Sequence, residues 1–182
     1  MQSEILISGF GGQGVLFAGQ VLAYAALDAG LHVTWFPSYG PEMRGGTAHC
    51  TVIISDDEIG SPIVRNPQGV LAMNLPSLDK YEPLVQPGGA LVVNASLVDR
   101  NPVRVDIETI MVPANQIAEE IGHRRLANLV MLGAFLQRRP VLSLEAIGAA
   151  LANHLPERHR DLLPLNLIAL ERGFDLAVAE TA

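Results

Sequence analysis

A glycine-rich turn between a predicted strand and a predicted helix is the feature that most constrains the fold. Residues 4–8 (EILIS) form a short apolar and β-branched run, which is typical of a buried strand. Residues 9–14 (GFGGQG) interrupt this run, and residues 15–28, rich in Ala and Leu, have the character of a helix. A second predicted strand covers residues 31–36 and ends at Pro37. Strand, turn, helix and strand in this order have the size of a βαβ unit with a right-handed crossover.

The rest of the chain continues an α/β pattern and then becomes helical. Further strands are expected at 48–55, 69–73, 89–94 and 104–110, with a turn or short helix near 76–84. Helices rich in Leu and Ala are expected at 114–121, 124–138, 143–153 and 164–178. The predicted fold class is α/β: a three-layer, mostly parallel Rossmann-like sheet with helices on both faces and a helical C-terminal third. We expect residues 1–182 to form one domain, with an α/β core at 1–112 and a mainly helical part at 113–182 packed on it.

Composition and charge exclude several classes of protein. Apolar residues make up 49% and charged residues 17% of the chain, which is the opposite of a disordered composition. The formal net charge of −7 provides no electrostatic footprint for nucleic acid or for an anionic membrane. Residues 5–27 are uncharged, but their five glycines argue against a membrane span. The single cysteine, Cys50, is too little for an iron–sulfur cluster or a disulfide and points to the cytoplasm.

The glycine turn suits an anionic ligand. Residues 9–14 satisfy G-x-G-x-x-G, and the helix that follows would present free N–H groups and the positive end of its dipole. The pattern lacks the carboxylate that an NAD site needs at the end of the second strand, and no lysine follows Gly14 as in a Walker A loop. The alternative is that these glycines only permit close packing of helix, sheet or a partner chain. The residues alone favour neither role.

The loop at 37–47 (PSYGPEMRGGT) is a second candidate binding element. In a parallel sheet the loop after the second strand would lie beside the glycine turn, at the edge where ligands usually bind. Arg44 offers a two-pronged donor to a phosphate or a carboxylate. Alternatively, Arg44 pairs with Glu42 or with a backbone carbonyl and stiffens the loop.

Several segments together resemble one known family. The turn GFGGQGV at 9–15 and the segment PSYGPEMRGGTAHCTVIIS at 37–55 are similar to the gamma subunits of 2-oxoacid:ferredoxin oxidoreductases, in particular those of the 2-oxoglutarate and branched-chain 2-oxoacid type (the pyruvate/ketoisovalerate oxidoreductase gamma family). Segments 72–81, 87–97 and 127–136 fit the same pattern. The small subunit of indolepyruvate oxidoreductase is a related alternative, and a free-standing Rossmann-like nucleotide-binding oxidoreductase is a more distant one.

The resemblance implies an accessory subunit of an enzyme. The complete enzyme would oxidatively decarboxylate a 2-oxoacid to acyl-CoA and reduce ferredoxin, using thiamine diphosphate, magnesium and iron–sulfur clusters held by alpha, beta and delta subunits. This chain would bind none of these cofactors alone and would supply assembly and a contact with coenzyme A, or assembly only, and it could form a homodimer in isolation. The residues do not show which 2-oxoacid is the substrate.

No catalytic residue and no metal ligand is assigned to this chain. Its histidines have no metal-binding spacing, and the nearest pair, His154 and His159, reads as a solvated helix end. The candidate residues for binding a cofactor come from the two glycine-rich loops. They are Gly9, Gly11, Gly12, Gln13, Gly14, Ser38, Tyr39, Gly40, Glu42, Arg44, Gly45 and Gly46.

Overall fold

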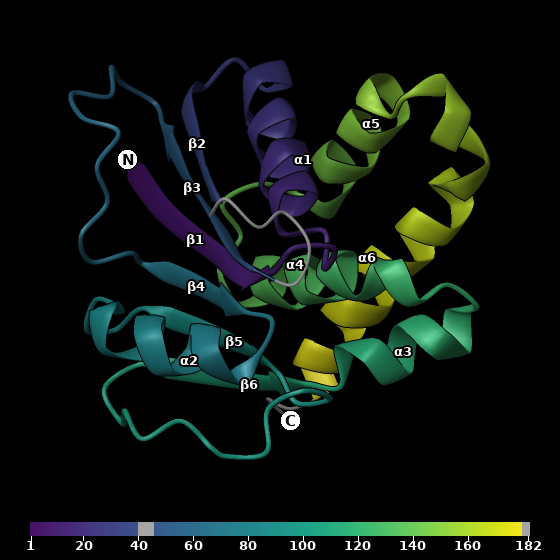
Figure 1. The fold of residues 1–182 in the computed structure, drawn as a ribbon. Helices are drawn as coiled ribbons and strands as arrows, with labels where there is room; N and C mark the ends of the chain where they lie inside the picture. The colour runs from purple at the N-terminus through teal and green to yellow at the C-terminus, as the bar shows by residue number, and fades with distance from the viewer. Residues whose placement is uncertain (40–45, 180–182) are drawn as a thin grey trace.

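The computed structural model describes residues 1–39 and 46–179, and within them one mixed sheet forms the centre of the molecule (Figure 1). Its strands are β1 (Gln2–Phe10), β2 (His32–Tyr39), β3 (Thr47–Ser55), β4 (Gly69–Ala72), β5 (Ala90–Asn94) and β6 (Glu108–Val112). They lie in the order β2-β3-β1-β4-β5-β6. The pairs β1–β4, β4–β5 and β5–β6 are parallel, whereas β3 is antiparallel to both of its neighbours. The predicted α/β class with a mostly parallel sheet is confirmed.

Helices cover both faces of the sheet, and the C-terminal third is helical as expected (Figure 1). The helices are α1 (Val15–Asp28), α2 (Leu75–Tyr81), α3 (Ala114–Ile121), α4 (Ala127–Arg138), α5 (Leu144–His154) and α6 (Leu163–Ala179). Short 3-10 helices occupy 82–84, 124–126 and 157–162. In the described part of the chain, none of the helices has the length and apolar character that a membrane crossing requires.

Two apolar cores lie on the two faces of the sheet because strand side chains alternate between them. Ile5 and Ile7 of β1 point into the larger core, which includes α1 and the helices of the C-terminal third. Leu6 points into the smaller core, where Leu78 of α2 is fully buried. The central strands β4 and β5 are buried along their whole length, which explains their nearly continuous apolar sequences.

The predicted adjacency of the first two strands is wrong. β3 lies between β1 and β2, so that Ser8 of β1 and Ser38 of β2 both face His49 of β3 in the register of the sheet. The chain leaves β2 and returns as an antiparallel β3, which then pairs with β1 on its other side. β1 and β2, which α1 connects, are therefore not neighbours in the sheet but are separated by β3.

Three strands also differ from the prediction by two residues or more. β1 runs from Gln2 to Phe10 where a strand at 4–8 was predicted, so Gly9 and Phe10 of the predicted turn belong to the strand. β2 does not stop at Pro37 but continues to Tyr39, because β2 is an edge strand and a proline there removes no hydrogen bond that an inner strand would need. The strand expected at 104–110 is β6 at Glu108–Val112. Residues 97–107 are instead held as a loop against α2 by contacts described below.

Two glycines bring α4 and α6 into close contact. A Cβ at Gly133 of α4 would collide with the carbonyl oxygen of Leu170, and a Cβ at Gly173 of α6 would collide with that of Val130. The two helix backbones therefore approach each other directly at these positions. This crossing joins α6 to α4, which itself packs against β4, β5 and β6.

Candidate functional site

The glycine turn at residues 11–14 joins the carboxyl end of β1 to the start of α1. Gly12 and Gly14 have φ angles of +99° and +74°, in the left-handed region that favours glycine. A Cβ at Gly12 would meet no atom of the described residues within 4 Å, so among these residues only the backbone conformation requires glycine there. Gly14 is the N-cap of α1 without a side-chain cap, and the first helical turn carries no acidic residue. The turn therefore leaves the N-terminus of α1 available to a negatively charged group.

Gly9 and Gly14 of the motif are also required for packing inside the protein. A Cβ at Gly9 would lie 2.6 Å from Oε1 of Gln13 and 2.8 Å from Cβ of Met73. A Cβ at Gly14 would lie 2.9 Å from Cγ of Asn128. These distances are too short for an added methyl group. Gly9 and Gly14 thus let α1 and α4 approach the turn closely, which is the packing alternative that the sequence left open.

Gln13 fastens the turn to the neighbouring parallel strand. Its Oε1 accepts hydrogen bonds from the backbone N–H of Phe10 (2.6 Å) and from Nδ2 of Asn74 (3.1 Å). Asn74 follows β4, and its Oδ1 accepts from the N–H of Ser77 (3.0 Å), which caps α2. One amide pair therefore ties β1, β4 and α2 together at the carboxyl edge of the sheet.

Further buried amides extend this network. Asn94, at the end of β5, donates through Nδ2 to the carbonyl of Met73 (3.2 Å) and to Oδ1 of Asn115 (2.8 Å). Asn128, on α4, donates through Nδ2 to the carbonyl of Gly14 (2.9 Å). Asn74, Asn94 and Asn128 are almost completely buried. Because buried polar groups need partners, these bonds fix the carboxyl edge in one arrangement.

Sequence reasoning missed these asparagines, although a local signal was present. Asn74 comes shortly after the apolar strand β4, in the segment GVLAMN, and Asn94 ends the otherwise apolar strand β5, in the segment ALVVN. A polar residue directly after a buried parallel strand lies at the edge where sites form. Asn128 stands alone in an apolar helix, and nothing local connects it to Gly14, which is 114 residues away.

The C-terminal end of the second glycine-rich loop contacts the glycine turn. The N–H of Gly11 donates to the carbonyl of Gly46 (2.9 Å), next to the register pair of Phe10 and Thr47. β2 ends with Ser38 and the backbone of Tyr39, and β3 lies between β2 and β1. Gly40, Glu42, Arg44 and Gly45 lie outside the described residues. The proximity of the two loops is thus seen at Gly46 and follows from the position of β3.

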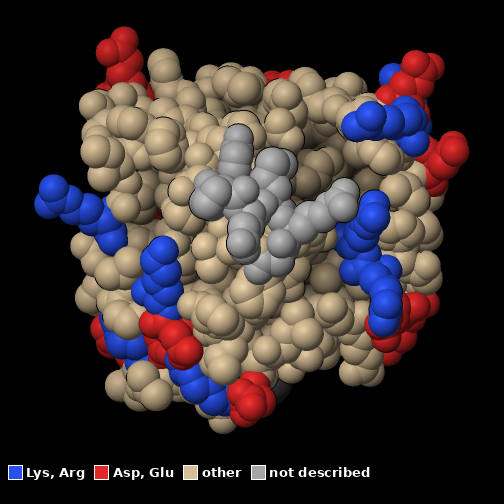
Figure 2. All heavy atoms as spheres, viewed as in Figure 1, with Lys and Arg blue, Asp and Glu red and all other residues tan. Residues whose placement is uncertain are grey.

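The described surface around the carboxyl edge is mainly uncharged. On the face shown in Figure 2, most of the area around the residues drawn in grey is tan, and basic side chains lie close to it on the right and at the lower left. Burial, with a further effect of the positive charge of Lys80, lowers the pKa of His49 on β3. His49 therefore stays neutral at neutral pH. Backbone N–H groups and amides at this edge can bind an anion or a polar group.

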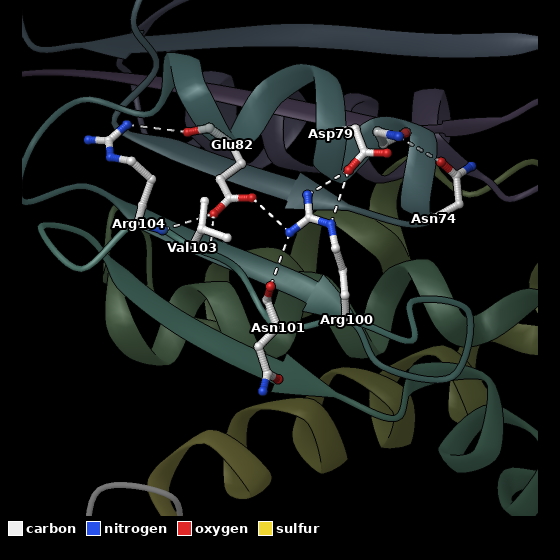
Figure 3. Close-up of polar contacts among 8 residues, drawn as sticks. Asn74, Asp79, Glu82, Arg100, Asn101, Val103 and Arg104 are labelled. Carbon is white, nitrogen blue, oxygen red and sulfur yellow. Dashed lines mark hydrogen bonds and ion pairs between the residues drawn. The ribbon is translucent and has the colours of Figure 1, made fainter.

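A second polar cluster holds the loop at 97–107 against α2 (Figure 3). Oε2 of the buried Glu82 accepts from Nη1 of Arg100 (3.1 Å), and its Oε1 accepts from the backbone N–H groups of Val103 and Arg104 (3.0 Å for Arg104). Arg100 also pairs with the exposed Asp79 (2.6 Å). Glu82 is therefore a structural clamp, and the contacts explain why no strand forms at 97–107.

The surroundings of Cys50 and His154 indicate that both residues have structural roles. Burial raises the pKa of the Cys50 thiol to about 12, so it is protonated and inert at neutral pH. His154 lies 3.0 Å from Asp28 and stacks on Tyr24 with ring centroids 4.2 Å apart, which joins α5 to α1. His159 is exposed. Among residues 1–39 and 46–179, no group of three or more His, Cys, Asp or Glu residues could hold a metal ion.

The fold and the turn define a Rossmann-like α/β protein whose glycine loop and buried amides form the carboxyl edge of the sheet. The chain belongs to the pyruvate ferredoxin/flavodoxin oxidoreductase family, whose model matches residues 4–176. The family expected from the sequence is thereby confirmed.

Relatives of known name match nearly the whole chain. It is 38% identical to the 2-oxoglutarate synthase subunit KorC of Methanothermobacter marburgensis over 183 residues, which covers 97% of each protein. It is 44% identical to the ketoisovalerate oxidoreductase subunit VorA of Methanothermobacter thermautotrophicus over 175 residues. That match covers 96% of this chain and 36% of VorA, so the chain spans about a third of the length of the VorA relatives.

Solved structures show the same fold. The gamma subunit of a keto/oxoacid ferredoxin oxidoreductase from Geobacter sulfurreducens is 35% identical, with a TM-score of 0.81 over 97% of this chain and 99% of that chain. A 2-oxoglutarate:ferredoxin oxidoreductase from Magnetococcus marinus, with 2-oxoglutarate, coenzyme A and succinyl-CoA bound, is 26% identical, with a TM-score of 0.87. That match covers 98% of this chain and 31% of that chain.

Proposed function

We propose that this chain is the gamma subunit of a multi-subunit 2-oxoacid:ferredoxin oxidoreductase, which decarboxylates a 2-oxoacid, forms acyl-CoA and reduces ferredoxin. The observation that carries the proposal is the match over nearly the full length of both KorC and the Geobacter gamma subunit. The partners would be the alpha, beta and delta subunits, with ferredoxin as the electron acceptor of the complex. A cytoplasmic location fits the unpaired Cys50.

The chemistry of thiamine and of iron–sulfur clusters would belong to the other subunits. A cluster needs several thiolates, whereas this chain has one cysteine, buried and with a raised pKa. These residues do not fit a cluster. The role of this chain is therefore accessory: it contributes surface for assembly and a binding edge.

The glycine turn is the part of the chain that best fits a contact with coenzyme A. The open backbone at Gly12 and the uncapped N-terminus of α1 suit a phosphate group. The adjacent loop would contribute Arg44 as the charged donor. Its other contributing residues would be Ser38, Tyr39, Gly40, Glu42, Gly45 and Gly46. Gly9, Gly11, Gln13 and Gly14 would hold the turn in shape.

A matched pair of glycine variants tests this contact in the reconstituted complex. Gly12 and Gly30 flank the two ends of α1, both have positive φ, and a Cβ at either would meet no atom within 4 Å in the part of the chain that the structure describes. Gly12→Ala and Gly30→Ala should therefore cost similar stability, about 1 kcal/mol. We expect only Gly12→Ala, and in the loop Arg44→Ala, to raise the KM for coenzyme A, by about tenfold.

The possible outcomes separate the two levels of the proposal. An unchanged KM for coenzyme A in Gly12→Ala and Arg44→Ala, with intact assembly, would exclude the coenzyme contact but not the subunit role. Failure of the chain to assemble with alpha and beta subunits would contradict the subunit role itself. Reduction of a dye by the isolated chain with a 2-oxoacid would contradict the accessory role.

An assembly-only role is the second candidate, and exposed apolar side chains favour it. Phe36 on the edge strand β2 is 59% exposed, and Val103 and Val105 on the clamped loop are 79% and 98% exposed. Such side chains suit contact with another chain. Tight binding of coenzyme A to the isolated subunit, measured by calorimetry, would argue against this candidate.

We also propose that residues 1–182 form one domain. The larger core supports this proposal because it includes both Ile7 of β1 and Leu132 of α4.

A further inference from the structure

A cavity of about 420 Å³ lies at the opposite edge of the sheet from the glycine turn. It is bounded by the amino ends of β1 and β4, by the segment that leads into β5, and by the end of α4 with the residues that follow it. Its volume lies in the range of small-molecule sites. Of the residues discussed for the coenzyme contact, none of those that the structure describes lines it.

Glycines shape two walls of this cavity. A Cβ at Gly69 would lie 2.6 Å from Cζ of Phe135, so glycine lets the aromatic ring cover the start of β4. Gly88 has a φ of +72°, and its carbonyl oxygen accepts a hydrogen bond from Nη2 of Arg139. The ring and the guanidinium group are therefore both held in place by the backbone of the sheet edge.

Arg139 differs from the other half-buried arginines that the structure describes. Arg100, Arg104 and Arg138 each pair with a carboxylate. Among residues 1–39 and 46–179, the side chain of Arg139 has one hydrogen-bond partner, the carbonyl of Gly88, and no carboxylate. Its Nε is buried without an acceptor, as is that of Arg138, but Arg138 also pairs with Glu108 through Nη1. A partly buried cation with so few partners is stabilised when an anion binds beside it.

The walls of the cavity indicate which anion would fit. Within residues 1–39 and 46–179, no Asp or Glu lines it, so no lining carboxylate of this part of the chain repels an anion there. Ile5, Phe135 and Val141 supply apolar surface, and Gln68 and Gln86 supply amides. A guanidinium group binds a carboxylate with two parallel hydrogen bonds. We propose that this cavity binds a small carboxylate with an apolar tail, with Arg139 as its charged partner and the ring of Phe135 against its tail.

This site is independent of the proposed subunit function, since it uses the amino edge of the sheet and the function uses the carboxyl edge. The ligand is defined by chemistry only: one carboxylate, few heavy atoms and an aliphatic part. Inorganic phosphate has the charge without the tail, and a primary amide has the tail without the charge. These two molecules are therefore the natural comparisons for a test.

Methyl-labelled NMR of the full chain tests the proposal, with 4-methylpentanoate as the probe. The methyl signals of Ile5 and Val141 should shift saturably, whereas those of Ile117 on α3 should not. The apparent Kd should be at least tenfold higher for 4-methylpentanamide, for inorganic phosphate, and for 4-methylpentanoate with Arg139→Gln. Arg124→Gln, an exposed arginine that pairs with Glu119, is the matched control and should bind as the parent does.

Each contrary result would overturn the proposal. Absence of saturable shifts in the parent chain would exclude the site, and equal binding of the amide or of phosphate would exclude the ligand class. Undiminished binding to a folded Arg139→Gln would exclude the role of the arginine. If Arg139→Gln does not fold, the comparison of acid and amide on the parent chain still decides whether a charged partner is present.

Discussion

At the scale of single residues, the protein uses small and polar side chains where the backbone must be positioned. Gly9 and Gly14 leave room for Gln13 and Asn128, and those amides hold the turn by hydrogen bonds. The same residues therefore pack the turn, and in the proposed function they also shape the contact with coenzyme A. Sequence reasoning identified the glycines but not Asn128, because its partner lies far away in the chain.

Cys50 provides a prediction about pH at this scale. Its folded pKa of about 12 lies above the ordinary value of 9.0, so the unfolded state loses the thiol proton first as the pH rises. The free energy of unfolding of the parent should fall by about 1.4 kcal/mol per pH unit above pH 9, relative to Cys50→Ala. Urea titrations of both proteins at pH 8, 9 and 10 measure this difference. Parallel pH profiles for the two proteins would show that the thiol does not titrate differently on unfolding.

At the scale of elements, helices and loops are fixed by contacts that join distant segments. The crossing of α4 and α6 depends on Gly133 and Gly173, and the loop at 97–107 depends on Glu82. β2 tolerates Pro37 because it is an edge strand. In each case, the contacts with a neighbouring element decide a conformation that the local sequence alone does not specify.

The helix crossing predicts different effects for two glycine variants. Gly133→Ala places a methyl group on the carbonyl of Leu170 and should cost about 3 kcal/mol of stability or more. At Gly148 on α5, the nearest atom is the end of the flexible Leu167 side chain at 3.1 Å. Gly148→Ala should be neutral within about 1 kcal/mol, since alanine favours the helix. Chemical denaturation compares the two, and equal losses would mean that the crossing is looser than described.

The Glu82 clamp predicts a second contrast at this scale. Glu82→Gln leaves Arg100 without its buried partner and should cost about 1–3 kcal/mol, because a neutral amide replaces a buried, hydrogen-bonded carboxylate. The side chain of Asp79 is 57% exposed, so Asp79→Asn should cost less than about 1 kcal/mol. Hydrogen exchange at the amides of Val103 and Arg104 should accelerate in the first variant only. Equal exchange in both would assign the order of the loop to other contacts.

At the scale of the whole molecule, charge and apolar surface suit a subunit of an assembly. The formal charge is −7 at pH 7 and the sequence pI is about 5.1. As the pH approaches this pI, repulsion between chains falls while Phe36 and Val105 stay exposed. We expect the isolated chain to be least soluble near pH 5 at low salt. Static light scattering from pH 4 to 8 measures this, and a minimum of solubility far from pH 5 would show that charge does not control association.

Local patterns of the sequence determined much of this protein by themselves. The order of strand, turn and helix over 4–28 and the helical C-terminal third were predicted correctly, because apolar periodicity and glycine act within a few residues. The family was predicted from the resemblance of segments such as 9–15 and 37–55, and the family model confirms it. The single cysteine likewise limits the chemistry without any knowledge of the fold.

Only the tertiary structure decided how these pieces meet. It placed β3 between β1 and β2, joined Gln13 to Asn74 and Gly14 to Asn128, and left Arg139 beside a cavity. Strand order and buried hydrogen bonds depend on partners far apart in the chain, and no local pattern specifies those partners. The physical reason is that a buried polar group or a strand edge needs a hydrogen-bond partner, and any segment that the fold brings close can supply it.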